Sequence, residues 1–234
     1  MITFELIKKK YALNNSYFKA TYYYHPQDVY EVLGYLKQHG ELPFKGLEGN
    51  EYWIYETFIE YQKRVRVELS QYFTPPKTAK LLAEIALKYF TNENEVILDA
   101  CCGFGALSYE LKKEGRTCIG FDGCYNMGAL YTHFTGFEFE NNSFEFYKKQ
   151  HKYIVANPPY EIPLLTAFLE KLHNNMLSDN GTAVLLMPKD FVKKDKPKAL
   201  VEILNKFNVC EVEAMQEQFA LTGINAEIVV LRKL

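Results

Sequence analysis

The tetrapeptide Asn-Pro-Pro-Tyr at residues 157–160 combines residue types that could do chemistry, and it closes the apolar run 152–156. Proline lacks a backbone N–H group, so the segment keeps carbonyl oxygens available, and the side chain of Asn157 adds a further acceptor. Two rigid acceptors suit a planar amine with two N–H donors, and Tyr160 offers a flat face for stacking. The pattern predicts a site for an amino group on a ring or an amide. The alternative is a proline-rich strand end with Tyr160 in the core.

A second candidate is the glycine-containing stretch VILDACCGFG, in which Asp99 ends a predicted strand. Gly103 and Gly105 allow a sharp turn and a close approach of the backbone to a ligand, and the following helix directs amide groups at that ligand. Asp122 ends the next predicted strand, at a spacing that suits a carboxylate bound to ribose hydroxyls. Ser108 stands where a dinucleotide fingerprint has its third glycine. A smaller adenosine-bearing ligand without a pyrophosphate therefore fits better than NAD.

The elements that must position these residues alternate between helices and short apolar strands from about residue 71 onward. Helices are expected at 75–90, 106–115, 125–133, 162–177 and 198–207, and strands at 95–100, 118–121, 137–146, 152–156, 182–188, 209–215 and 226–233. This alternation predicts a doubly wound α/β fold, with a mostly parallel sheet covered on both faces. Only a loop separates the last two strands, so one of them is expected to be antiparallel. Thr74 is expected to cap the first helix, with a proline at its first position.

Such a sheet binds ligands beyond the carboxyl ends of its strands, where the strand order reverses. The turn that contains Gly103 and Gly105, which we call the glycine turn, and the segment 157–160 both follow strands. We therefore expect them on the same edge of the sheet, at the carboxyl ends of the strands. The N-terminal part differs, because it is rich in Tyr, Phe and charged residues, with amphipathic helices expected at 26–40 and 50–69. We therefore expect a mainly helical, aromatic-rich extension over 1–68 and an α/β domain over 69–234.

Composition restricts the classes of protein. The chain has 234 residues, of which 48% are hydrophobic and 24% charged, as in an ordinary globular protein with a full core. A net charge of −2 disfavours a free-standing DNA-binding protein. No apolar run is long enough for a membrane span, and the N-terminus lacks the apolar core of a signal peptide. The five cysteines show no zinc-ligand spacing. These features predict a cytoplasmic protein with reduced thiols and no metal.

Four segments together carry a family resemblance: QYFTP (71–75), DACCGFG (99–105), GFD (120–122) and NPPY (157–160). In this order they resemble the S-adenosylmethionine-dependent DNA adenine-N6 methyltransferases, in the branch whose cofactor motifs precede the catalytic motif. The C-terminal strands are also similar to the end of that family's catalytic core. The resemblance covers about residues 70–234 and does not extend to the N-terminal extension.

The resemblance implies a seven-stranded sheet of the S-adenosylmethionine-dependent methyltransferase type, with S-adenosylmethionine as the cofactor. The cofactor-binding residues that it implies are Tyr72, Phe73, Thr74, Pro75, Asp99, Ala100, Gly103, Gly105, Asp122 and Asn142, the last in place of an acidic residue that the family often has. The catalytic segment that it implies is Asn157, Pro158, Pro159 and Tyr160. Asn157 and the Pro158 carbonyl would hold the target amine, while Tyr160 would stack on the extruded base. Lys152 stands where the family often has Asp.

The implied reaction is direct methyl transfer to the N6 amine of adenine in DNA, on a base that is flipped out or single-stranded. DNA is the expected substrate partner, and a separate target-recognition subunit is one explanation for the neutral surface; the N-terminal extension is another. RNA base methyltransferases and release-factor glutamine methyltransferases remain alternatives, although the latter have NPPY but lack QYFTP. A non-catalytic nucleic-acid-binding subunit with the same fold is a further alternative, against which the intact NPPY argues.

Overall fold

The computed structural model describes residues 74–123, 127–191, 197–215, 219 and 225–234. The chain divides into two compact units, 1–73 and 74–234, and every described residue belongs to the second. The helices expected at 26–40 and 50–69, and the candidate residues Tyr72 and Phe73, lie outside the described residues. The expected boundary between an extension over 1–68 and the α/β domain therefore stays a prediction.

The domain is built on one seven-stranded sheet with the order β3-β2-β1-β4-β5-β7-β6. The strands are β1 (Ile97–Ala100), β2 (Cys118–Asp122), β3 (Glu138–Asn141), β4 (His151–Ala156), β5 (Leu177–Pro188), β6 (Phe207–Ala214) and β7 (Ala226–Lys233). Parallel pairs run from β3 to β5, and β7 is antiparallel to both β5 and β6. The predicted mostly parallel sheet with one antiparallel strand is confirmed, and the antiparallel strand is the last one in the sequence.

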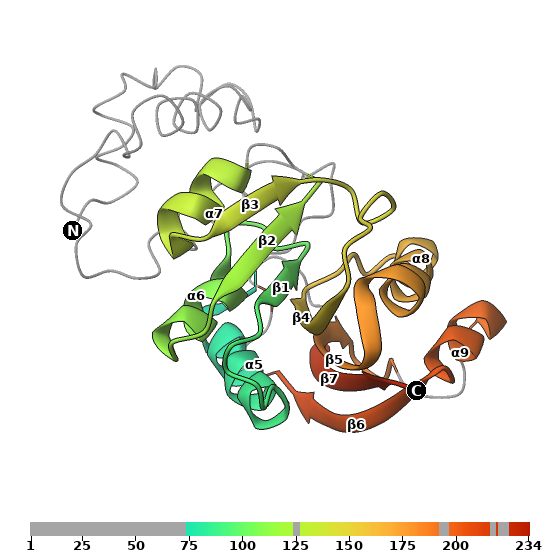
Figure 1. Ribbon diagram of the computed structural model, residues 1–234. Coiled ribbons are helices and arrows are strands. Elements are labelled where there is room, and N and C mark those ends of the chain that lie inside the picture. The colour runs from blue at the N-terminus through green and yellow to red at the C-terminus, as the bar shows by residue number, and fades with distance from the viewer. Residues whose placement is uncertain (1–73, 124–126, 192–196, 216–218, 220–224) are drawn as a thin grey trace, which may run out of the picture. The chain divides into compact units, whose positions relative to one another are not determined.

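Helices cover both faces of this sheet. They are α5 (Pro76–Tyr89), α6 (Ala106–Lys113), α7 (Met127–Thr135), α8 (Ile162–Lys171) and α9 (Lys198–Leu204), and a π-helical turn, η1 (Leu172–Met176), continues α8. In Figure 1, α5, α6 and α7 lie on one side of the sheet and α8 and α9 on the other. Helix α6 contacts both α5 and α7, whereas α8 contacts α9. The doubly wound architecture predicted from the alternating pattern is therefore confirmed.

The central strands carry the core, because their side chains are buried on both faces. Leu98 in β1, Ile154 in β4, Leu185 in β5 and Val229 in β7 are all fully buried. Strands with apolar residues at consecutive positions are stable only when helices cover both sides of the sheet. The unbroken apolar runs thus predicted correctly that the sheet is covered on both faces.

The structure differs from the sequence prediction where the chain passes from α8 into β5. The helix expected at 162–177 is divided between α8 and the π-helical turn η1. Strand β5 begins at Leu177, which pairs with His151, but its next pair is Thr182 with Tyr153. The residues between these two pairs form a bulge, and the continuously paired part begins at Thr182, as predicted. A bulge of this kind leaves no mark on hydrophobic periodicity.

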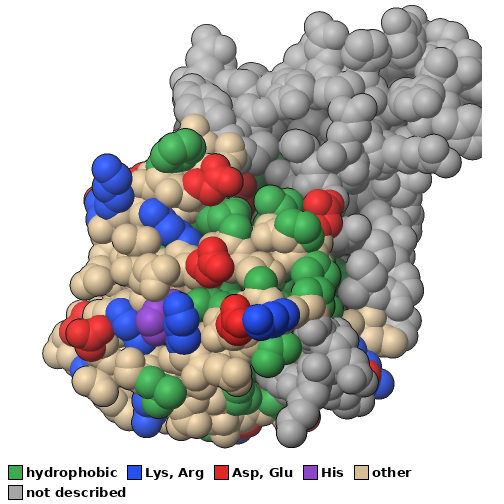
Figure 2. All heavy atoms as spheres, turned by 90° about the vertical axis from the view of Figure 1, so that its right-hand side faces the viewer, with side chains coloured by type: hydrophobic (Ala, Val, Ile, Leu, Met, Phe, Trp, Pro, Cys, Tyr) green, Lys and Arg blue, Asp and Glu red, His purple; other side chains and the backbone are tan. Residues whose placement is uncertain are grey.

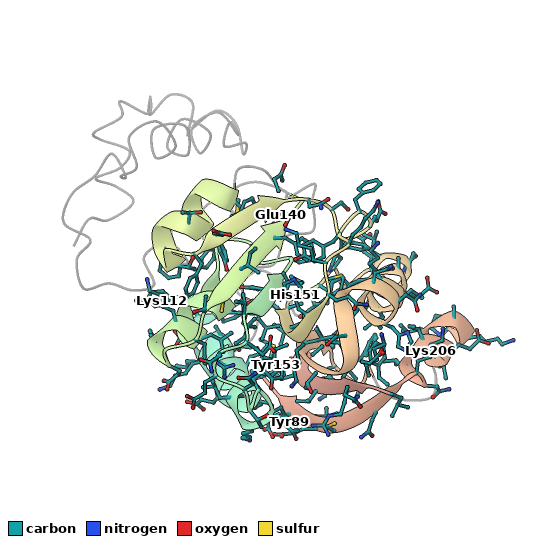
Figure 3. The ribbon with its side chains drawn as sticks, in the orientation of Figure 1. Tyr89, Lys112, Glu140, His151, Tyr153 and Lys206 are labelled. Carbon is teal, nitrogen blue, oxygen red and sulfur yellow. The ribbon has the colours of Figure 1, made fainter. Side chains whose placement is uncertain are left out.

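Buried polar side chains close the amino-terminal edge of the sheet. The Arg116 guanidinium donates hydrogen bonds to the Phe90 and Asn92 carbonyl oxygens at 3.0 and 2.8 Å. The Tyr153 ring stacks on Phe90 with a centroid distance of 4.5 Å, and its hydroxyl accepts a hydrogen bond from the Asn92 backbone amide. Figure 3 labels Tyr153 near α5. These contacts join α5 to the sheet at the edge opposite to the candidate site.

The described surface carries charges of both signs. On the face that Figure 2 shows, acidic and basic side chains are interspersed, and neither sign covers a continuous area among the described residues. Within the part of the chain that the structure describes, no helix has the length and apolar character needed to span a bilayer.

Candidate active site

The glycine turn and the segment 157–160 begin at the same edge of the sheet. Strands β1 and β4 are parallel neighbours, and the register pairs Ala100 with Ala156, the last residue of each strand. Figure 1 shows the two strands side by side. The turn at 101–105 and the segment 157–160 therefore leave the sheet next to each other, at the switch point where α/β folds bind ligands. This placement agrees with the sequence prediction.

The turn after β1 has three residues in the left-handed region: Cys101 at φ 55°, Gly103 at φ 53° and Gly105 at φ 93°. Gly105 is also the residue from which α6 starts. A Cβ atom on Gly105 would lie 2.6 Å from Thr135 Cγ2 and 2.8 Å from the ring of Tyr131. Glycine is needed there for the backbone conformation and for the close packing of α7. The sequence predicted the sharp turn but not this neighbour.

Asp122 joins the glycine turn to the end of β2. The backbone amide of Gly103 donates a hydrogen bond of 3.0 Å to Asp122 Oδ2. The backbone amide of Asn142 donates to the Asp122 carbonyl oxygen at 3.1 Å, while the Asn142 side chain donates to Glu140 Oε1 at 3.5 Å. Three predicted cofactor-binding residues thus lie within one hydrogen-bonded group. Their role toward a cofactor stays a prediction.

Asp99 is fully buried beneath the turn. Its Oδ2 accepts hydrogen bonds from the Ser108 backbone amide at 3.1 Å and the Ser108 hydroxyl at 2.7 Å, and Ser108 Oγ lies 2.7 Å from the Tyr131 hydroxyl. Burial raises the pKa of the Asp99 carboxyl from 3.8 to about 7, although the bonds from Ser108 lower it. The bonds from Ser108 join the start of α6 to the end of β1, and the role of Asp99 toward a cofactor stays a prediction. Ser108, which the sequence marked only as a missing glycine, is the residue that Asp99 binds.

The raised pKa of Asp99 makes stability depend on pH in a testable way. Between pH of about 4 and about 7 the folded protein retains a proton on Asp99 that the unfolded chain has lost, so the free energy of unfolding falls as pH rises through this window. We expect Asp99→Asn to remove this part of the dependence. The measurement is urea unfolding of both proteins at pH 5 and pH 8. Asp179→Asn, at an exposed carboxylate, is the control. An equal loss of stability in wild type and Asp99→Asn would contradict the prediction.

The segment 157–160 leaves β4 with Asn157 half-buried and Pro158 buried. The Asn157 side-chain nitrogen Nδ2 donates a hydrogen bond of 3.2 Å to the hydroxyl of Thr74, which is buried. The Tyr160 ring lies edge to face with Phe219, with a centroid distance of 5.8 Å and an interplanar angle of 75°. Burial raises the pKa of the Tyr160 hydroxyl well above its ordinary value. Phe219 was not among the predicted site residues.

The predicted cap of α5 is wrong by one residue. Pro75 is the N-cap with an extended backbone, Pro76 is the first helical residue, and no side chain caps the helix. The Thr74 hydroxyl instead accepts the bond from Asn157, 83 positions away in the sequence. Local sequence patterns predict caps because a capping residue bonds to its own helix. A bond to a distant strand end has no such signal.

Comparison with known proteins identifies a family over part of the chain. Residues 53–117 match the family model of the N-6 DNA methylases. Over these residues the chain is similar to the N-6 DNA methylases. We call residues 53–117 the methylase segment. The predicted resemblance, which began at about residue 70, is confirmed from there to residue 117, and the match also includes residues 53–69, for which no resemblance was predicted. The methylase segment includes residues 71–75 and 99–105, whereas 157–160 lies beyond it. A comparison with curated proteins gave no significant match.

Solved structures share the fold of the domain at residues 74–234. A protein from Listeria monocytogenes, assigned as a class I S-adenosylmethionine-dependent methyltransferase, has a TM-score of 0.66 at 14% identity, over 88% of this chain and 80% of that one. A protein from Pyrococcus horikoshii, assigned as an RNA methyltransferase, has a TM-score of 0.59 at 17% identity, over 88% of this chain and 96% of that one.

A modification subunit from Vibrio vulnificus YJ016, assigned to a type I restriction enzyme, has a TM-score of 0.57 at 15% identity, over 85% of this chain and 52% of that one. The chain spans about half the length of this subunit and of TrmN from Thermus thermophilus. The domain therefore has the fold of S-adenosylmethionine-dependent methyltransferases, as predicted.

Proposed function

We propose that this protein transfers a methyl group from S-adenosylmethionine to the N6 amine of adenine in DNA. The observation that carries the proposal is the position of Asn157 and Pro158, which leave β4 beside the glycine turn of a domain similar in part to the N-6 DNA methylases. An amine acceptor site and a nucleoside site then share one edge of the sheet. The amine acceptor site alone, or the nucleoside site alone, would not favour methyl transfer to an amine over another reaction of an adenosine-bearing ligand.

The residues at the glycine turn fit an adenosine-bearing cofactor. Asp122 ends β2 beside the turn, and a carboxylate has two oxygens that can each accept more than one hydrogen bond. The Asp122 carboxylate can therefore accept hydrogen bonds from the Gly103 amide and from ribose hydroxyls at the same time. Asn142 follows β3, and its backbone amide donates to the Asp122 carbonyl oxygen, which supports the proposal that Asn142 contacts the base of the nucleoside. Gly105 starts α6, whose first amide groups would be directed at the cofactor.

The segment 157–160 supplies what a poor nucleophile needs. The lone pair of adenine N6 is delocalised into the ring. Asn157 Oδ1 and the Pro158 carbonyl oxygen would accept both N6 hydrogens and favour a more tetrahedral nitrogen. After transfer, the positively charged, methylated N6 would release one proton to solvent. When bound, S-adenosylmethionine supplies an activated methyl group whose bond to sulfur breaks as the bond to N6 forms, leaving the electron pair on sulfur. Tyr160, supported by Phe219, would stack on the extruded base. The main contribution of these residues is orientation of the amine.

We further propose that a separate target-recognition subunit delivers the DNA. A net charge of −2 and the interspersed charges in Figure 2 provide little electrostatic attraction for a phosphate backbone. A protein that binds DNA by itself usually concentrates Lys and Arg on one face. The similarity to a modification subunit of a restriction enzyme supports the same arrangement.

The test is incubation of the purified chain with methyl-labelled S-adenosylmethionine and separate pools of duplex DNA, single-stranded DNA, RNA and protein. With a cell extract supplying the target-recognition subunit, we expect label in DNA, recovered as N6-methyladenine after digestion. Label in DNA from the purified chain alone would contradict the separate subunit. The RNA pool matters because a structure with the same fold is assigned as an RNA methyltransferase. Label confined to RNA, or to glutamine in protein, would contradict the proposed substrate. A protein that binds the cofactor and transfers nothing, even with a cell extract supplying a subunit, would contradict the activity.

A further inference from the structure

The side chains of Thr74 and Asn157 form a hydrogen bond between two distant parts of the domain. The Asn157 Nδ2 atom donates to Thr74 Oγ1 at 3.2 Å, in a partly buried setting. Thr74 precedes α5 and belongs to the methylase segment, whereas Asn157 follows β4. Thr74 is buried, and its hydroxyl does not cap α5. Its described bond is therefore to the side chain on which the proposed reaction depends.

We propose that Thr74 is a positioning residue that orients the side-chain amide of Asn157 for the amine of the substrate. This inference rests on the proposed function and deepens it, because it assigns to Thr74 a role different from contact with the cofactor. The role is that of a support for the acceptor, and Thr74 itself touches no reacting atom.

The geometry of an amide group explains how one hydrogen bond can do this. Oδ1 and Nδ2 lie in one plane on the same carbon atom, so a bond that holds Nδ2 also sets the direction of Oδ1. With the amide turned over, Nδ2 would face a substrate amine that is itself a donor, and the two donors would repel. The terminal torsion of an Asn side chain is soft and has two broad minima, so an external partner is needed to select one. Thr74 Oγ1 is that partner in the structure.

The burial of the bond increases its effect. Thr74 is 6% exposed, so water has little access to replace its hydroxyl as the partner of Nδ2. Its neighbour Pro75 fixes the backbone where α5 begins, and the helix packs on the sheet through its buried residues. A side chain that holds a catalytic group needs such a rigid support, because small displacements of that group are costly for the rate.

The test is Thr74→Val, which keeps the shape of the side chain and removes the hydroxyl, compared with Thr74→Ser, which keeps the hydroxyl. Loss of one such hydrogen bond is expected to lower kcat about tenfold. The dissociation constant of S-adenosylmethionine, measured by calorimetry, is expected to stay within twofold (about 0.4 kcal/mol). Thr74→Ser is expected to restore most of kcat. Thr132→Val, at an exposed threonine of α7, is the matched control and should match wild type.

Two further measurements separate positioning from a merely structural role. In the background of Asn157→Ala, Thr74→Val should change kcat no further, because the amide that it orients is gone. The side-chain NH₂ signal of Asn157 in a ¹⁵N NMR spectrum, assigned from its absence in Asn157→Ala, should shift in Thr74→Val and not in Thr132→Val.

The outcomes also separate this inference from the proposed function. A Thr74→Val protein that loses cofactor affinity while a single turnover proceeds at the normal rate would overturn the inference and make Thr74 a cofactor ligand. Unchanged kcat would overturn it as well. A wild-type protein that methylates none of the pools would contradict the proposed function instead. The NMR comparison would then still decide whether Thr74 holds the amide.

Discussion

Replacement of Asn157 by alanine is expected to lower the rate of methyl transfer by at least about 100-fold at saturating S-adenosylmethionine. The variant lacks Oδ1, one of the two acceptors proposed to hold the N6 amine, so the lone pair stays delocalised and the amine is no longer oriented. The hydrogen bond to Thr74 is lost at the same time. The measurement is a single-turnover assay with labelled cofactor on the substrate pool that wild type methylates.

Cofactor binding and a matched variant make this result interpretable. The cofactor residues proposed here lie on the glycine turn and the ends of β2 and β3, so Asn157→Ala should bind S-adenosylmethionine nearly as wild type does. Asn208→Ala, at an exposed asparagine of β6, controls for the loss of an amide elsewhere on the domain and should keep full activity. Full activity of Asn157→Ala with the cofactor saturating would rule out the proposed mechanism.

Replacement of Gly105 by alanine is expected to lower the free energy of unfolding by about 3 kcal/mol or more. Two independent effects add. The backbone at φ 93° disfavours an L side chain, and the new Cβ would lie 2.6 Å from Thr135 and 2.8 Å from Tyr131. Thr135 and Tyr131 are both buried, so they have little room to move. Chemical unfolding of the purified variant measures the loss.

Two other glycines separate the two effects. Gly115 has φ 74°, and a Cβ atom added to it would meet no other atom within 4 Å, so Gly115→Ala tests the backbone alone and should cost about 1 kcal/mol. Gly120 lies in β2 without a positive φ, and its Cβ would approach the Tyr131 ring at 2.4 Å, so Gly120→Ala tests crowding alone. Equal losses for Gly105→Ala and Gly115→Ala would contradict the packing argument.

Much of the fold could be predicted because its signals are local. The runs that became β1, β4 and β7 have apolar residues at consecutive positions rather than alternate ones, and they indicated a sheet covered on both faces. The segment 157–160 could be assigned to the carboxyl edge because every parallel strand ends there. The register pairing Ala100 with Ala156 then brings it beside the glycine turn, as expected.

The rest depends on partners that are distant in sequence. The hydroxyl of Thr74 was expected to cap α5, but it instead accepts a hydrogen bond from Asn157, which follows β4. The bonds from Ser108 to Asp99 were not predicted either, while the role of Asp99 toward a cofactor stays a prediction. The crowding of Gly105 by Tyr131 follows from the way α7 packs against α6. Such contacts are set by tertiary packing, for which one sequence has no periodic signal.

The position of β7 between β5 and β6 has a consequence for folding during translation. When a nascent polypeptide has left the ribosome only as far as Ala214, β6 is outside but the strand that it pairs with is still inside the exit tunnel. The same delay leaves one side of β5 without its neighbour. Strands β1 to β5 can pair as they emerge, whereas this half of the sheet must wait until residues 226–233 clear the exit tunnel. Until then its unpaired backbone is exposed to aggregation and to chaperones.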